Sequence, residues 1–183
     1  ATADLPEGFA PWQLQRVGAQ RALVQLERSS ELSERLGDNA PRLNAGLLHP
    51  WVWNGARSLW SSGHYLEAVR AASVQLNAET QNKIRNREIS EAALFQNAFS
   101  DDAPQPGKPR LRFVDDDGGK TAQSVRRGIR FFAEGCYAAI RNPASHDPQA
   151  ELPETEALEQ LAAFSILARW VDCAVVVAVN DSP

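Results

Sequence analysis

The chain has 183 residues, about the size of one ordinary domain, and 43% of them are apolar, including five tryptophans and seven phenylalanines. This composition is sufficient for a hydrophobic core, so we do not expect an intrinsically disordered protein. The net charge of −4 excludes a broadly basic nucleic-acid coat protein, although a local basic patch remains compatible with it. No apolar run approaches the ~18 residues of a transmembrane helix, so we expect no membrane segment.

The N-terminal sequence and the cysteines bear on the cellular compartment. The sequence starts ATADLPEGFA, without the basic-then-apolar pattern of a signal peptide, and Cys136 and Cys173 form no CxxC motif. These features predict a cytoplasmic protein with reduced, buried thiols.

Charge is distributed unevenly along the chain. Residues 81–141 carry a net charge of +3, whereas residues 142–183 carry −6. The central basic residues are either ordinary solvated helix faces or a binding surface, and charge alone does not decide between them.

The first half of the chain has a helical pattern. Helix formers dominate from about residue 11 to residue 35, and Pro50 fits the first turn of a second helix that ends at Gly63. A third helix follows from His64, because apolar residues then recur with the spacing of one helix face. Ser90 is a suitable N-cap for a short helix that ends near residue 98.

The second half contains the strongest helix signal. Residues 100–120 are rich in proline and glycine and predict a loop with a brief extended run at 111–114. In the helix that follows, one face is apolar, and it comprises Val125, Ile129, Phe132, Cys136, Ala139 and Ile140. The opposite face comprises Arg126, Arg127, Arg130, Glu134, Tyr137 and Arg141. Pro143 ends this helix, and a last helix covers residues 154–177.

These elements predict an all-α fold. We expect a four-helix bundle with one or two short extra helices, because evidence for strands is almost absent. Residues 1–48 form an N-terminal helical extension and residues 49–183 form the bundle, as one compact unit overall.

Several familiar motifs are incomplete. The run Gly118 to Thr121 lacks the upstream glycine of a P-loop, and the acidic run 115–117 lacks the spacing of an EF-hand. The three histidines are scattered and form no zinc motif, and no nucleophile elbow for a serine hydrolase is present. We therefore expect no metal and no cofactor.

The sequence RNPASH at 141–146 is the remaining candidate. Its structural interpretation is an ordinary helix end, with an arginine near the C-terminus, an asparagine and a proline. Its functional interpretation is a phosphodiester site, because Arg141 projects from the basic face and is followed by the ionisable His146. On that face Arg141 is in register with Arg130.

These residues resemble the signature of the HEPN (higher eukaryotes and prokaryotes nucleotide-binding) superfamily, which is an arginine, a polar residue and a histidine shortly after. The wider pattern resembles the Ymh-type family of bacterial uncharacterised proteins. The similar pieces are His49-Pro50, GHYLEAVRAA, QSVRRG, EGCYAAIRNPASH and SILARWVD, over roughly residues 49–178.

The resemblance implies a homodimer in which two copies of the motif face each other. It also implies a metal-independent endoribonuclease, of the kind that serves as a toxin or phage-defence effector. Other members of the superfamily are non-catalytic modules that bind nucleotides or nucleic acid. The acidic segment 142–183 is a candidate contact for a basic partner, such as an antitoxin or another neighbouring-gene protein, and an adaptor role is a third alternative.

The expected chemistry uses the 2′-OH of RNA as nucleophile. His146 would serve as general base or general acid, Arg141 would hold the phosphate, and Asn142 would orient the phosphate or Arg141. Side chains that would contact the RNA elsewhere are Arg126, Arg127, Arg130 and Tyr137. Tyr137 would either stack on a base or form a partly exposed interface aromatic.

Overall fold

The computed structural model describes residues 11–36, 43–143 and 152–179. Its contacts divide the chain into two units, Ala1–Arg42 and Leu43–Pro183. The first unit contains helix α1 (Pro11–Leu36), whose described side chains are all exposed. The sequence analysis placed the boundary after residue 48, whereas Leu48 is part of the core of the second unit.

The described part of the second unit is mostly helical, in agreement with the all-α prediction. Its helical elements are η1 (Ala45–Leu47, a 3₁₀ turn), α2 (Pro50–Ser61), α3 (Tyr65–Ile84), α4 (Glu91–Ala98), α5 (Lys120–Gly135), η2 (Cys136–Arg141, a π-helical segment) and α7 (Glu154–Cys173). None of the described helices is both long and apolar enough to cross a membrane.

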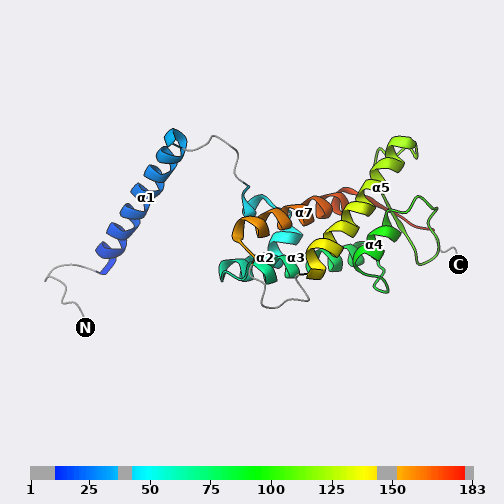
Figure 1. Ribbon diagram of the computed structural model, residues 1–183, viewed down its shortest axis with the longest axis horizontal. Coiled ribbons are helices and arrows are strands. Elements are labelled where there is room, and N and C mark those ends of the chain that lie inside the picture. The colour runs from blue at the N-terminus through cyan, green and yellow to red at the C-terminus, as the bar shows by residue number, and fades with distance from the viewer. Residues whose placement is uncertain (1–10, 37–42, 144–151, 180–183) are drawn as a thin grey trace. The chain divides into compact units, whose positions relative to one another are not determined.

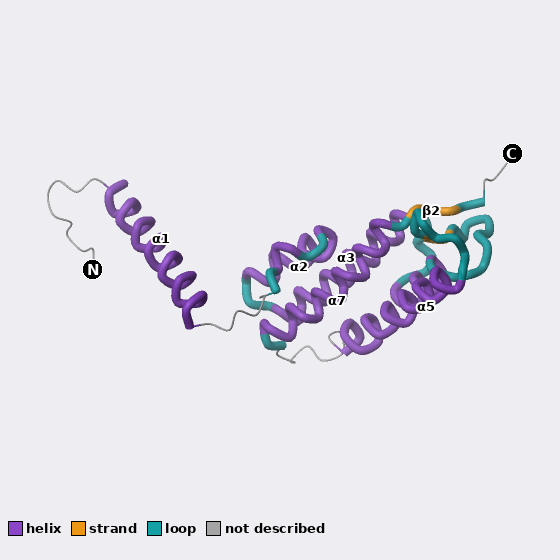
Figure 2. Tube along the Cα trace, turned by 90° about the horizontal axis from the view of Figure 1, so that it is seen from above, coloured by secondary structure: helices purple, strands orange, loops and turns teal. Residues whose placement is uncertain are grey.

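Helix α3 is central to the packing, since it contacts α2, α4, α7 and η2. Figures 1 and 2 both show α3 and α7 lying side by side. Gly55 permits α2 to approach α3 closely, because a Cβ at this position would lie 2.9 Å from Cβ of Gln75. The core is filled by fully buried side chains from five helices, among them Val52, Leu76, Phe95, Ile129 and Phe164. Burial of such side chains contributes most of the favourable free energy of folding.

A small antiparallel sheet closes one end of the second unit. It pairs β1 (Arg110–Arg112) with β2 (Val175–Val177), with Leu111 opposite Val176. The extended run expected at 111–114 is thus partly confirmed, but the prediction that the last helix continues to residue 177 is wrong. Helix α7 ends at Cys173, because the valines that follow favour a strand and find β1 as a partner.

The buried face of α5 and η2 includes Ile129 and Cys136, as predicted, but it also includes two residues that were assigned to the opposite face. Arg126 and Tyr137 are only 4% and 2% exposed, whereas Val125, assigned to the apolar face, is 44% exposed. The burial of Arg126 is compensated by two carboxylates from the preceding loop, which a periodicity argument does not include. Cys136 is buried as expected, but Cys173 is exposed.

Candidate functional site

Arg141 lies at the last position of η2, directly after α5 in the chain. Its Nη2 lies 2.7 Å from Oε1 of Glu91, and its Nη1 donates a hydrogen bond to Oδ1 of Asn142 at 3.1 Å. The side chain is 27% exposed, so the guanidinium is oriented by neighbours and still reaches the surface.

A pocket of about 190 Å³ opens beside this guanidinium. Its lining comes from the middle of α3, the first residue of α4 and η2, and consists of Ser73, Val74, Asn77, Glu91, Tyr137 and Arg141. The pocket thus combines an arginine, a carboxylate, an amide and a hydroxyl over a small volume. Such a set of convergent polar groups is typical of a site that binds a charged or polar ligand.

Glu91 has an unusual backbone conformation. Its φ is +55°, in the left-handed region that costs a residue with a Cβ about 1–2 kcal/mol. The conformation is held because the amide nitrogen of Glu91 donates to Oδ1 of Asn77 at 2.6 Å. Ser90, the predicted N-cap, makes no side-chain cap hydrogen bond. Strain of this kind is frequently found at functional sites, where the surrounding structure maintains it.

Tyr137 forms part of the wall of the pocket from the core side. Its hydroxyl donates to the backbone carbonyl of Ser73 at 3.2 Å, and its ring packs against Phe95 and Phe164, each at a centroid distance of 5.7 Å. Burial is the main cause that raises its pKa far above the ordinary value, so the hydroxyl stays protonated. Both expected roles, base stacking and an exposed interface aromatic, require exposure that this ring lacks.

The arginines of α5 do not gather at the Arg141 pocket. Arg126 forms ion pairs with Asp101 and Asp116, and Arg130 pairs with Asp101 at 2.9 Å. The hydrogen bond from Arg126 is the main cause that lowers the pKa of Asp116. Arg126 is therefore a buried structural residue in this cluster, and it precedes Arg141 by about 20 Å along the helix axis.

The remaining predicted residues have different positions. Arg127 is exposed on α5, and Asn142 contacts Arg141 as described above. His146 lies outside the described residues. Glu91 was missed by the sequence analysis, because a carboxylate in the first turn of a helix ordinarily needs no explanation beyond the helix dipole. Within the described part of the chain, no group of three or more histidine, cysteine or acidic side chains is arranged to hold a metal ion.

The comparisons with known proteins agree with one of the resemblances. No curated protein and no solved structure matches the chain. A family model described as "Protein of unknown function (Hypoth_ymh)" matches residues 46–171. The match covers most of the second unit, including all residues that line the Arg141 pocket. The chain therefore belongs to the Hypoth_Ymh family.

Proposed function

We propose that this protein is a metal-independent endoribonuclease of the HEPN type, built on a four-helix bundle and active as a homodimer. The observation that carries the proposal is the Arg141 guanidinium, which is held from two sides by Glu91 and Asn142 at the edge of a polar pocket. The fork of an arginine matches two oxygens of a phosphodiester and stabilises the charge that builds up there during attack.

The reaction uses a nucleophile that RNA itself provides. The 2′ oxygen forms a bond to the adjacent phosphorus, and the bond from phosphorus to the 5′ oxygen breaks. The proton of the 2′-OH passes to one imidazole, and the leaving 5′ oxygen receives a proton from a second imidazole. The two copies of His146 in the dimer perform these roles, and the products carry a 2′,3′-cyclic phosphate and a 5′-OH. DNA lacks the 2′-OH and does not react.

The positions of the other arginines refine the expected RNA contacts. Arg127 is the exposed member of the predicted set, so it is better placed to contact the RNA backbone than Arg126, which is buried between two aspartates. A toxin or phage-defence role follows from the resemblance, and the negative charge of segment 142–183 makes that segment the proposed contact for an antitoxin.

Substitutions at Arg141 test the proposal. In EDTA, wild type should cleave labelled single-stranded RNA, and Arg141→Lys should lose roughly 10²–10³-fold in kcat, because a lysine retains the charge but not the planar fork. Arg57→Ala, at an exposed position on α2 away from the pocket, is the matched control and should cleave as wild type does. Circular dichroism and melting temperature would establish that each variant is folded.

A non-catalytic binding module of the same fold is the second candidate. The pairing of Arg141 with Glu91 favours it, since a carboxylate beside the guanidinium offsets part of the positive charge that would stabilise the transition state. RNA binding that weakens in Arg141→Lys, without cleavage by wild type, would support the module and contradict the nuclease.

A further inference from the structure

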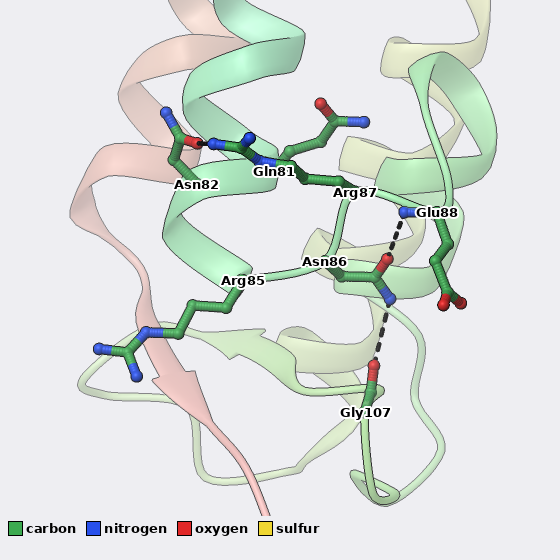
Figure 3. Close-up of a pocket in the computed structure, with 7 residues that line it drawn as sticks. All are labelled: Gln81, Asn82, Arg85, Asn86, Arg87, Glu88 and Gly107. Atoms are coloured by element: carbon green, nitrogen blue, oxygen red, sulfur yellow. Dashed lines mark hydrogen bonds between the residues drawn. The ribbon is translucent and has the colours of Figure 1, made fainter.

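A second and larger pocket lies at the C-terminal end of α3, where the link to α4 begins (Figure 3). Its volume is about 610 Å³, and every residue that lines it is polar, charged or glycine. The lining includes Arg85 and Arg87 against one acidic residue, Glu88. A pocket with this charge balance favours an anion.

Hydrogen bonds shape the walls of this pocket. Arg87 donates from Nη2 to Oδ1 of Asn82 at 3.0 Å, and Asn86 donates from Nδ2 to the carbonyl of Gly107 at 3.1 Å, as Figure 3 shows. The amide nitrogen of Glu88 in turn donates to Oδ1 of Asn86 at 2.9 Å. The link is thus tied both to α3 and to the loop around Gly107, so its arginines are attached to a supported backbone.

The backbone of the link provides an independent indication of function. Among the described residues, the only non-glycine positions with positive φ are Arg85 (+53°) and Glu91 (+55°). Arg85 occupies the C-cap of α3, where glycine would avoid the strain. A cation near this end of α3 is favoured by the helix dipole, but Lys83 already provides one in the last turn without strain.

One of the two strained residues lies in the wall of each pocket. Arg85 lines the larger pocket and Glu91 lines the Arg141 pocket, so they bracket a link that borders both. On α3, Asn77 and Gln81 line the two pockets one helical turn apart, or about 6 Å along the axis. Arg85 lies about 12 Å beyond Asn77 along the same helix, a distance that a single strand of RNA, with a phosphate at every nucleotide, would have to span to reach both pockets.

We propose that the α3–α4 link forms a phosphate subsite, in which Arg85 and Arg87 bind the backbone of single-stranded RNA next to the phosphate at Arg141. The inference rests on the proposed RNA binding at Arg141, but not on catalysis. In this role the larger pocket positions the RNA backbone by charge. Neither the sequence motif nor the family match suggests such a role.

Binding of an uncleavable RNA tests the subsite separately from the nuclease. The probe is a fluorescein-labelled single-stranded oligonucleotide of 2′-O-methyl RNA, and its anisotropy gives Kd at several salt concentrations. The double variant Arg85→Gly/Arg87→Ala should bind roughly tenfold more weakly, and its slope of log K against log salt should be smaller by about 1.4, or about 0.7 for each lost phosphate contact. Glu88→Gln should bind more tightly, because it removes the one negative charge of the pocket.

Arg57→Ala is the matched control and should retain the wild-type slope. The glycine in the double variant suits the left-handed backbone at position 85, so the variant should remain folded, as a melting curve would show. An unchanged slope in the double variant, an equal loss in Arg57→Ala, or no binding by wild type would overturn the subsite. Binding with the predicted slopes but without cleavage of ordinary RNA would support the subsite and contradict only the nuclease.

Discussion

Replacement of Glu91 by glycine or by alanine separates backbone strain from side-chain contact at the proposed site. Both substitutions remove the ion pair with Arg141, and both retain the hydrogen bond from the amide of residue 91 to Asn77. Alanine keeps the Cβ and therefore the strain at φ +55°, whereas glycine relieves it.

The free energies of the ion pair and of the backbone strain predict an order of stability for wild type and the two variants. The ion pair joins side chains that are 27% and 34% exposed, so its loss costs at most about 1 kcal/mol. Relief of strain in the glycine variant returns about 1–2 kcal/mol, and the greater freedom of glycine in the unfolded chain removes about 0.5–1 kcal/mol of that gain. Glu91→Gly should therefore stay within about 0.5 kcal/mol of wild type, while Glu91→Ala should be about 1 kcal/mol less stable than the glycine variant.

Urea denaturation followed by circular dichroism measures this difference as a shift in midpoint at constant slope. Both variants lack the ion pair with Arg141, so each serves as the control for the other. An alanine variant that is as stable as the glycine variant, or more stable, would refute the argument that Glu91 is strained.

Further predictions concern the loop cluster and the thiols. Arg126→Ala should lower the free energy of unfolding by roughly 1–3 kcal/mol in urea denaturation, because among the described residues the carboxylate of Asp116 then keeps only the hydrogen bond from the amide of Gly118. Since Arg126 lowers the pKa of Asp116, the pair stabilises the fold fully above the unfolded pKa of about 3.9, and this contribution is lost as pH falls through the lower folded pKa. Denaturation between about pH 5 and pH 2 should therefore show a shallower loss of stability in Asp116→Asn than in wild type. Burial raises the pKa of Cys136 to about 11, so a thiol reagent near neutral pH should modify Cys173 rapidly and Cys136 only after unfolding.

The helices could be predicted from local signals. Pro50 begins α2 and Gly63, with φ +79°, follows its end, as their backbone preferences indicate. The periodic apolar residues after His64 form the buried face of α3. Such signals depend on neighbours in sequence, so one chain is sufficient to find them.

Two expectations differ from the structure, because residues far apart in sequence determine which side chains of α5 are buried and where α7 ends. Arg126 belongs to the buried face of α5 because Asp101 and Asp116 return from the preceding loop to pair with it. Val175 to Val177 leave the helix because β1 lies beside them. Hydrophobic periodicity therefore placed Ile129 and Cys136 correctly in the core, but it missed Arg126 and set the end of the last helix too late.

Only part of the candidate site could be predicted from the sequence, because some of its residues come from elements that are distant along the chain. Arg141 and Asn142 stand in a motif and were found, whereas Glu91 and Asn77 come from other helices and meet Arg141 only in the folded chain. The strain at Glu91 and Arg85 is a property of backbone dihedrals that residue types did not indicate. Both pockets at the α3–α4 link therefore required the structure.

We propose that the chain cleaves RNA by attack of the RNA's own 2′-OH, with His146 in the site. The most direct measurement is to incubate total RNA in EDTA with wild type and with folded His146→Ala and to determine the chemistry of the new ends. We predict 2′,3′-cyclic phosphate and 5′-OH ends from wild type and no cleavage by the variant. Equal cleavage by both proteins, or no cleavage by a folded dimeric wild type, would contradict the claim.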